Sequence, residues 1–175
     1  MKKINDWEKV KASDDNSRLP AGGYVCEIVR AEDNPEKNYL RLEYDIAEGE
    51  YKDYWQSTAE RFGWWGGDFY RSYKDSALGM FKGFINAVEG SNGGFKWEWN
   101  EKALEGKLVG LVLGEEEYIK NDGSVGTRLK VRNVKPSQDI RSGKFKVPEK
   151  KVLPNESKAS NSTTGFTPSD SDIPF

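Results

Sequence analysis

The chain has 175 residues, of which 35% are apolar and 32% charged, so it is long enough for one domain with a hydrophobic core and a tail. It contains no histidine and a single cysteine, Cys26, which excludes His-dependent catalytic triads, His-ligated zinc, Cys-rich metal sites and an intrachain disulfide. No apolar run approaches the roughly 20 residues of a membrane span, and the first residues lack the apolar core of a signal peptide. We therefore expect a soluble, cytoplasmic protein without membrane contact.

Charge is unevenly distributed along the chain. Residues 127–151 carry nine basic and two acidic side chains, a local charge of +7, whereas the whole chain has a net charge of −2. A local excess of Lys and Arg attracts phosphate even in a protein that is acidic overall. A solvated strand followed by a loop is the alternative interpretation of this segment.

The first half of the chain predicts short antiparallel strands. A Pro-Ala-Gly-Gly turn precedes a run of β-branched and aromatic residues, so residues 19–30 predict a turn and a strand. Residues 38–46 alternate apolar and polar side chains, which is typical of a half-buried strand. We expect a third strand around residues 51–55. Residues 60–74 lack clean periodicity and contain three glycines, which predicts a loop or lid.

One helix and two further strands follow. In residues 75–89, apolar side chains recur at three- and four-residue spacing, which predicts an amphipathic helix. A single helical turn is expected at residues 101–104, and an apolar strand from residue 107 to 120. The Asn-Asp-Gly-Ser sequence at 121–124 is a strong hairpin signal, and it leads into a strand at 126–134.

This order of elements predicts a mainly β fold. Five short strands, with one α-helix between the third and the fourth, indicate an OB-fold-like five-stranded barrel. A β-sandwich or an α+β sheet fits less well, because only about five strands are visible. We assign residues 1–18 to an N-terminal arm and residues 19–136 to the barrel.

The end of the chain has a different composition. Ser, Thr, Asn, Gly and Pro dominate much of residues 137–169, and such a segment buries too little apolar area to repay ordering, so we expect a flexible linker. The last six residues, 170–175, depart from this pattern. A purely solvating tail has no need of an apolar end, so we interpret them as a tip that binds a partner protein through Asp170, Asp172, Ile173, Pro174 and Phe175.

Aromatic and basic residues are interleaved in the middle of the chain, most densely within residues 55–74. Stacking of a base on an aromatic ring contributes about 1–3 kcal/mol with little dependence on base identity, and nearby cations bind phosphates. Packing in the core is the alternative, but Trp64 and Trp65 are adjacent, so both cannot easily face one core. The candidates for binding a single-stranded nucleic acid in this segment are Trp55, Arg61, Trp64, Trp65, Tyr70, Arg71 and Lys74.

Basic residues also occupy every second position of the last predicted strand. Arg128, Lys130 and Arg132 share one face there, opposite Leu129 and Val131. Their spacing of about 7 Å suits contact with a single-stranded phosphate backbone. A solvated face of the sheet is again the alternative.

Signals for catalysis or a cofactor are weak. Glu115, Glu116 and Glu117 are consecutive, so on a strand they point to alternate faces and do not converge on one metal ion. Neither a GxxxxGK(S/T) phosphate-binding loop nor a zinc-ligand spacing occurs. We therefore expect no enzyme activity, no metal site and no cofactor.

The tip, Asp170-Ser171-Asp172-Ile173-Pro174-Phe175, resembles the acidic C-terminus of bacterial and phage single-stranded DNA-binding proteins. In that family an OB-fold is followed by a flexible linker and an Asp-rich Ile-Pro-Phe ending. The tip of this chain has two acidic residues, fewer than family members usually have. The Leu-Pro-Ala-Gly-Gly-Tyr-Val sequence at 19–25, residues 44–49 and the Asn-Asp-Gly hairpin resemble instead a group of small replication and recombination proteins of phages that infect Gram-positive bacteria.

The resemblance implies a protein that coats single-stranded DNA during phage DNA replication or recombination in the host cytoplasm. The tip would recruit replication or recombination proteins by placing the Phe175 ring in an apolar pocket with basic side chains beside it. Two alternatives remain open at this point: a protein-interaction adaptor that does not bind DNA, and a Mg²⁺-dependent nuclease. Homo-oligomerisation is also left open by the sequence.

Overall fold

The structure is a computed structural model that describes residues 3, 5, 8 and 18–154. Five antiparallel strands form one sheet in the order β3-β2-β1-β4-β5. Their bounds are Gly22–Asn34 for β1, Tyr39–Ile46 for β2, Asp68–Ser72 for β3, Leu108–Ile119 for β4 and Val125–Lys135 for β5. The mainly β prediction is confirmed. The predicted tip, most of the predicted arm and residues 155–169 of the predicted linker lie outside the described residues.

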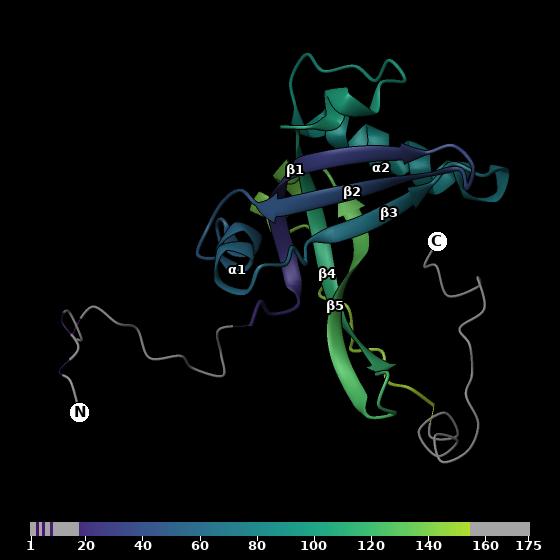
Figure 1. Cartoon of the computed structure of the whole chain (residues 1–175). Coiled ribbons are helices and arrows are strands. Elements are labelled where there is room, and N and C mark those ends of the chain that lie inside the picture. The colour runs from purple at the N-terminus through teal and green to yellow at the C-terminus, as the bar shows by residue number, and fades with distance from the viewer. Residues whose placement is uncertain (1–2, 4, 6–7, 9–17, 155–175) are drawn as a thin grey trace.

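The sheet bends because β1 is shared by two of its parts. Residues 22–27 of β1 pair with β4, whereas residues 26–34 pair with β2, and the register shifts between Ile28 and Arg30. As a result β2 and β3 run across the direction of β4 and β5 (Figure 1). β3 and β5 are the two edges of the sheet, and no pairing joins them in the part of the chain that the structure describes, so the sheet is open.

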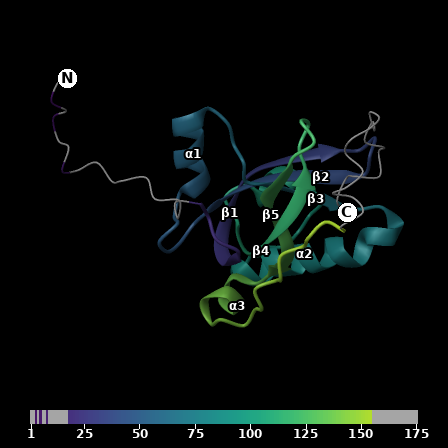
Figure 2. The same ribbon diagram turned by 90° about the horizontal axis from the view of Figure 1, so that it is seen from below.

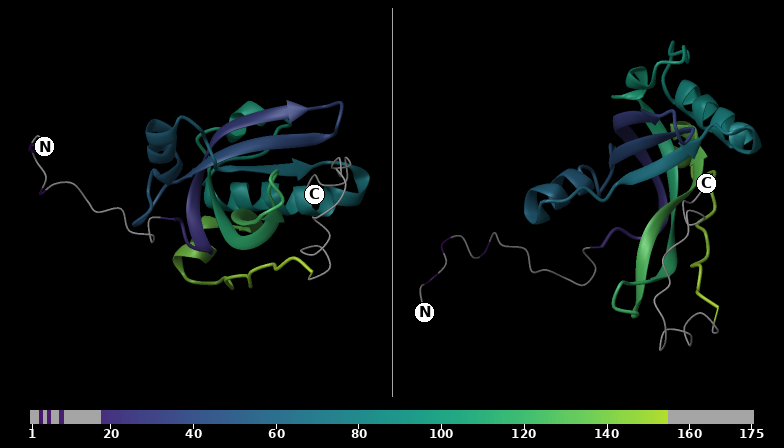
Figure 3. Two further views of the ribbon diagram at one scale, coloured as in Figure 1. Left: turned by 60° about the horizontal axis from the view of Figure 1, so that its bottom comes forward. Right: turned by 45° about the vertical axis from the view of Figure 1, so that its right-hand side comes forward.

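The predicted helix between the third and fourth strands is present as α2, Leu78–Ser91, preceded by a 3-10 turn at Asp75–Ala77. Its buried side chains, among them Phe81, Phe84 and Val88, form one core with the inner face of the sheet. Figures 2 and 3 show α2 lying along the sheet, with α1 (Tyr54–Phe62) projecting from the opposite end of the molecule. The predicted turn at 101–104 and the hairpin between β4 and β5 are also present.

The predicted third strand at residues 51–55 is wrong. Residues 51–53 form a turn and α1 begins at Tyr54, and the third strand, β3, lies inside the segment predicted to be a loop. The turn depends on Asp53, which adopts a left-handed backbone with φ 61°. Left-handed geometry ends an extended run, and Asp is one of the few residues that accept it.

The predicted linker does not begin at residue 137. A short helix, α3 (Ser137–Arg141), occupies this position, and its Ile140 packs with Val25 and Val112 on the outer face of the sheet. Further along, the N–H and C=O of Lys151 pair with the backbone of Glu115 and Glu117 on β4. The pairing of β1 with β4 covers residues 108–113 of β4, so Lys151 pairs with the part of the β4 edge that β1 does not reach.

Within the described residues, no helix has both the length and the apolar character needed to cross a membrane.

Candidate nucleic-acid interface

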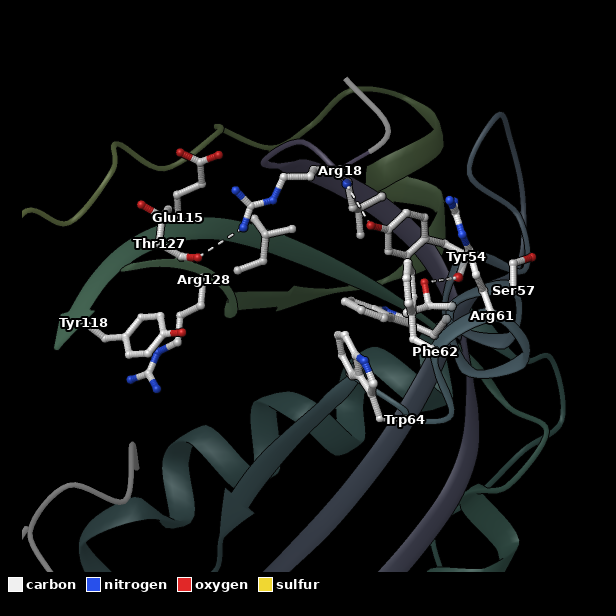
Figure 4. Close-up of a pocket in the computed structure, with 15 residues that line it drawn as sticks. Arg18, Tyr54, Ser57, Arg61, Phe62, Trp64, Glu115, Tyr118, Thr127 and Arg128 are labelled. Carbon is white, nitrogen blue, oxygen red and sulfur yellow. Dashed lines mark hydrogen bonds between the residues drawn. The ribbon is translucent and has the colours of Figure 1, made fainter. Parts of the chain in front are cut away.

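A cleft of about 710 Å³ lies between α1 and the β4–β5 hairpin (Figure 4). One wall carries Phe62 and Trp64, from the end of α1 and the loop that follows it. The other wall carries Tyr118 from β4 and Arg128 from β5. Leu19, at the start of the described domain, lines the cleft between the walls. Segments far apart in the sequence therefore contribute to one surface.

The α1 wall is held in place by glycines beyond the end of the helix. Gly63, with φ 78°, ends α1 in the left-handed conformation that favours glycine, and its N–H donates to the Ala59 carbonyl at 2.8 Å. Gly67 then brings the chain against Trp55: a Cβ there would lie 2.4 Å from Trp55 Cδ1. Because the chain turns this tightly, Phe62 and Trp64 point outward and are 60% and 56% exposed.

The two adjacent tryptophans have different environments. Trp64 is exposed at the cleft, whereas Trp65 packs against the core and its Nε1 donates to the Gly67 carbonyl at 3.1 Å. Trp55, which we predicted to stack on bases, is buried, with its ring 4.9 Å from that of Tyr54 and 6.4 Å from that of Tyr44. Trp55 lines the cleft but packs in the core and is only 9% exposed, which leaves little of its ring for a base, so its stacking role stays a prediction.

Arg61 is the cation best placed beside the exposed rings. Its guanidinium lies 5.0 Å from the centre of the Phe62 ring, and no carboxylate of the described residues lies within 4.0 Å of it. Among the described residues, therefore, no carboxylate neutralises Arg61, and the exposed Phe62 and Trp64 line the same cleft. This combination meets both requirements for single-strand binding, a surface for bases and a cation for phosphates.

The remaining candidates on and after β3 do not line the cleft. Tyr70 lies on the outer face of the sheet, with its ring 5.3 Å from that of Tyr39. Arg71 packs over Phe69 at 5.1 Å, and burial lowers its pKa to about 10, so it remains charged at neutral pH. Lys74 is exposed just beyond the strand. The structure therefore does not bring these three residues together with Trp64.

The predicted basic row on β5 does not form a free positive path. Arg128 Nε lies 2.7 Å from Glu116 Oε1, because the hairpin register places these two residues opposite each other. Arg132 is the extra residue at a bulge in the pairing of β5 with β4; it donates to the Glu115 carbonyl at 3.2 Å, and its side chain is 14% exposed. Burial lowers the pKa of Lys130. Acidic residues of β4 thus neutralise much of the charge that the sequence suggested.

The segment at the start of the domain joins the two walls of the cleft. Arg18 Nη2 donates to the Thr127 carbonyl of β5 at 3.4 Å, while the N–H of Leu19 donates to the Tyr54 hydroxyl of α1 at 3.2 Å (Figure 4). Leu19 is buried, which anchors this segment in the core. Arg18 therefore joins Arg61 and Arg128 as a third arginine that lines the cleft.

Sequence reasoning missed Arg18 and Tyr118 as parts of this surface, and it placed Phe62 in the dense aromatic segment without choosing it as a contact. The sequence did contain a signal for Tyr118. Counting back from the 121–124 hairpin turn pairs Glu116 with Arg128 and Tyr118 with Gly126, which places Tyr118 on the same face of the hairpin as Arg128. Nothing in the sequence indicated Arg18, because its position in the cleft depends on where the core holds Leu19. No cluster of three or more metal-ligating side chains occurs in the described part of the chain.

No protein-family model matches this chain, and no curated protein matches it.

Proposed function

We propose that this protein binds single-stranded DNA, with little sequence preference, in the cleft between α1 and the β4–β5 hairpin. The observation that carries the proposal is the pair of exposed rings, Phe62 and Trp64, in one cleft with Arg61, which has no carboxylate partner among the described residues. Phe62 and Trp64 line the same cleft, and exposed apolar side chains that gather in one patch mark a binding surface, whereas single exposed ones do not. Bases of any identity stack on such rings, which accounts for binding without sequence preference.

The architecture supports the same proposal. We propose that the domain is a partly open OB-fold, since its strand order, β3-β2-β1-β4-β5, places β3 and β5 at the two edges of the sheet and α2 follows the third strand. OB-folds bind single strands across the barrel face between flanking loops. The cleft lies beside the β4–β5 connection, one of these loops.

We further propose a place for this activity in phage DNA replication or recombination in the host cytoplasm. The support is the resemblance of the tip, residues 170–175, to the C-terminus of single-stranded DNA-binding proteins. In this proposal the domain coats DNA, and Asp170, Asp172, Ile173, Pro174 and Phe175 bind a replication or recombination protein.

The test is titration of fluorescently labelled oligo-dT with the full chain, followed by anisotropy at several salt concentrations. We expect binding that weakens steeply with salt, because cations that contact phosphates release counterions from the DNA. Trp64→Ala should lose about 1–3 kcal/mol of binding free energy, the contribution of one stacked base. Trp99→Ala is the matched control, because Trp99 is 81% exposed but does not line the cleft.

Absence of binding by correctly folded protein at low salt would refute the proposal and favour an adaptor that binds only proteins. Equal losses in the Trp64 and Trp99 variants would show that the cleft is not the binding surface. Cleavage of labelled DNA that requires Mg²⁺ would favour a nuclease instead.

A further inference from the structure

The wall of the cleft opposite Trp64 carries an aromatic side chain with no role in the function proposed above. Tyr118 projects from β4, and Figure 4 shows it facing the α1 wall across the cleft. The Arg128 guanidinium lies 4.9 Å from the centre of the Tyr118 ring. Glu116 Oε1 also pairs with Arg128 Nε at 2.7 Å. Arg128 therefore connects Glu116 and Tyr118 on the hairpin.

The register of the hairpin also restricts the Tyr118 ring. Gly126 lies directly opposite Tyr118 on β5, and a Cβ at Gly126 would come within 2.9 Å of Tyr118 Cε1. The ring thus lies across the backbone of β5, in space that only glycine leaves open. Packing on Gly126 and the cation at Arg128 together limit the rotamers of Tyr118. A ring whose position is already limited loses less conformational entropy when a base stacks on it.

On the basis of the proposed function, we propose that Tyr118 is a second stacking platform for nucleobases, and that Arg128 is a positioning residue that holds it. A single strand would cross the cleft with one base on the Phe62–Trp64 wall and another on Tyr118. The ligand class is an unpaired strand, because a base within a duplex is already stacked and cannot reach either wall. This role replaces the phosphate contact that the sequence suggested for Arg128, whose charge Glu116 neutralises.

The direct test is photocrosslinking of the full chain to oligo-dT that carries a single 5-iodouracil, followed by identification of the crosslinked peptides. We expect crosslinks at both Trp64 and Tyr118. Anisotropy titration should show about 5- to 150-fold weaker binding for Tyr118→Ala, the loss that corresponds to one stacked base. Tyr118→Phe keeps the ring and should bind within about twofold of the parent. Ile119→Ala is the matched control, because Ile119 is exposed on the same hairpin and points to the opposite face.

The role of Arg128 is tested separately. Arg128→Ala should weaken binding without changing the slope of affinity against salt, and it should add little in the Tyr118→Ala background, because both changes remove the same platform. Arg128→Lys keeps a cation near the ring and should recover most of the loss. A salt slope reduced by about one in Arg128→Ala would identify a phosphate contact and overturn the positioning role.

The outcomes separate this inference from the proposed function. If the parent chain binds no oligonucleotide, the proposed function fails and this inference fails with it. If the parent binds and Trp64→Ala weakens binding, but Tyr118→Ala binds normally and no crosslink forms at Tyr118, only the second platform is overturned.

Discussion

Asp45 is a buried carboxylate on which the position of α1 depends. It is 6% exposed and lies at the end of β2. Its Oδ1 accepts the N–H of Ile46 and that of Trp55, both at 2.8 Å, and its Oδ2 accepts the N–H of Gln56 at 3.0 Å. Trp55 and Gln56 belong to the first turn of α1, where backbone N–H groups have no partner within the helix. Asp45 thus caps α1 from a neighbouring strand, in place of the exposed Asp53.

Asp45→Asn tests this arrangement, because asparagine has nearly the same shape. An amide keeps one oxygen for the N–H groups of Ile46 and Trp55 but turns an NH₂ group toward the N–H of Gln56. One hydrogen bond to a charged acceptor is lost and an N–H is left unpaired, each worth about 1–3 kcal/mol. Loss of the negative charge at a helix N-terminus adds about 0.3–2 kcal/mol. We expect the free energy of unfolding to fall by about 3 kcal/mol.

Urea unfolding followed by circular dichroism measures this loss, and hydrogen exchange locates it. For a domain of this size, we expect the melting temperature to drop by about 6–12 °C, with the largest gain in exchange in residues 54–62. Oligo-dT binding should weaken too, because α1 carries Phe62. Asp53→Asn is the control: Asp53 is exposed, has no capping hydrogen bond, and its left-handed backbone suits Asn. A loss below about 1 kcal/mol for Asp45→Asn, with unchanged exchange in α1, would refute the reasoning.

Three further predictions concern packing, the hairpin and the tip. Gly67→Ala should lower the free energy of unfolding by about 2 kcal/mol or more, since the new Cβ would lie 2.5 Å from a backbone carbonyl oxygen. Gly83 lies inside α2, where an added Cβ would have no atom of the described residues within 4 Å, so Gly83→Ala should raise the free energy of unfolding by about 0.5–1 kcal/mol. Urea titration checks both, and equal effects of the two changes would contradict the packing argument. Arg132→Glu should cost about 3 kcal/mol and increase exchange in the hairpin, because it places a second carboxylate beside Glu116; an unchanged unfolding midpoint would count against it. Deletion of residues 170–175 should leave oligo-dT affinity unchanged or slightly higher and should abolish recovery of replication or repair proteins from a bacterial lysate, so equal recovery by the shortened chain would argue against the tip.

Local patterns in the sequence were sufficient for most of the secondary structure. The alternation in residues 38–46, the three- and four-residue spacing in 75–89 and the Asn-Asp-Gly turn at 121–124 each predicted the element that the structure contains. These signals are reliable because each depends on neighbours within one strand, one helix face or one turn. The exposure of Trp64 beside a packed Trp65 also follows from local geometry, since adjacent side chains rarely share one environment.

Only the tertiary structure decided where α1 forms and which cations are free. Residues 51–55 have the composition of a strand, but a helix starts there because Asp45, ten residues before Trp55, supplies the cap and the core takes up Trp55. The basic row on β5 has the right spacing for phosphates, yet the pairing with β4 places Glu116 beside Arg128 and Arg132. Helix capping and charge neutralisation across strands both depend on groups brought together by folding, which a pattern read along one segment does not contain.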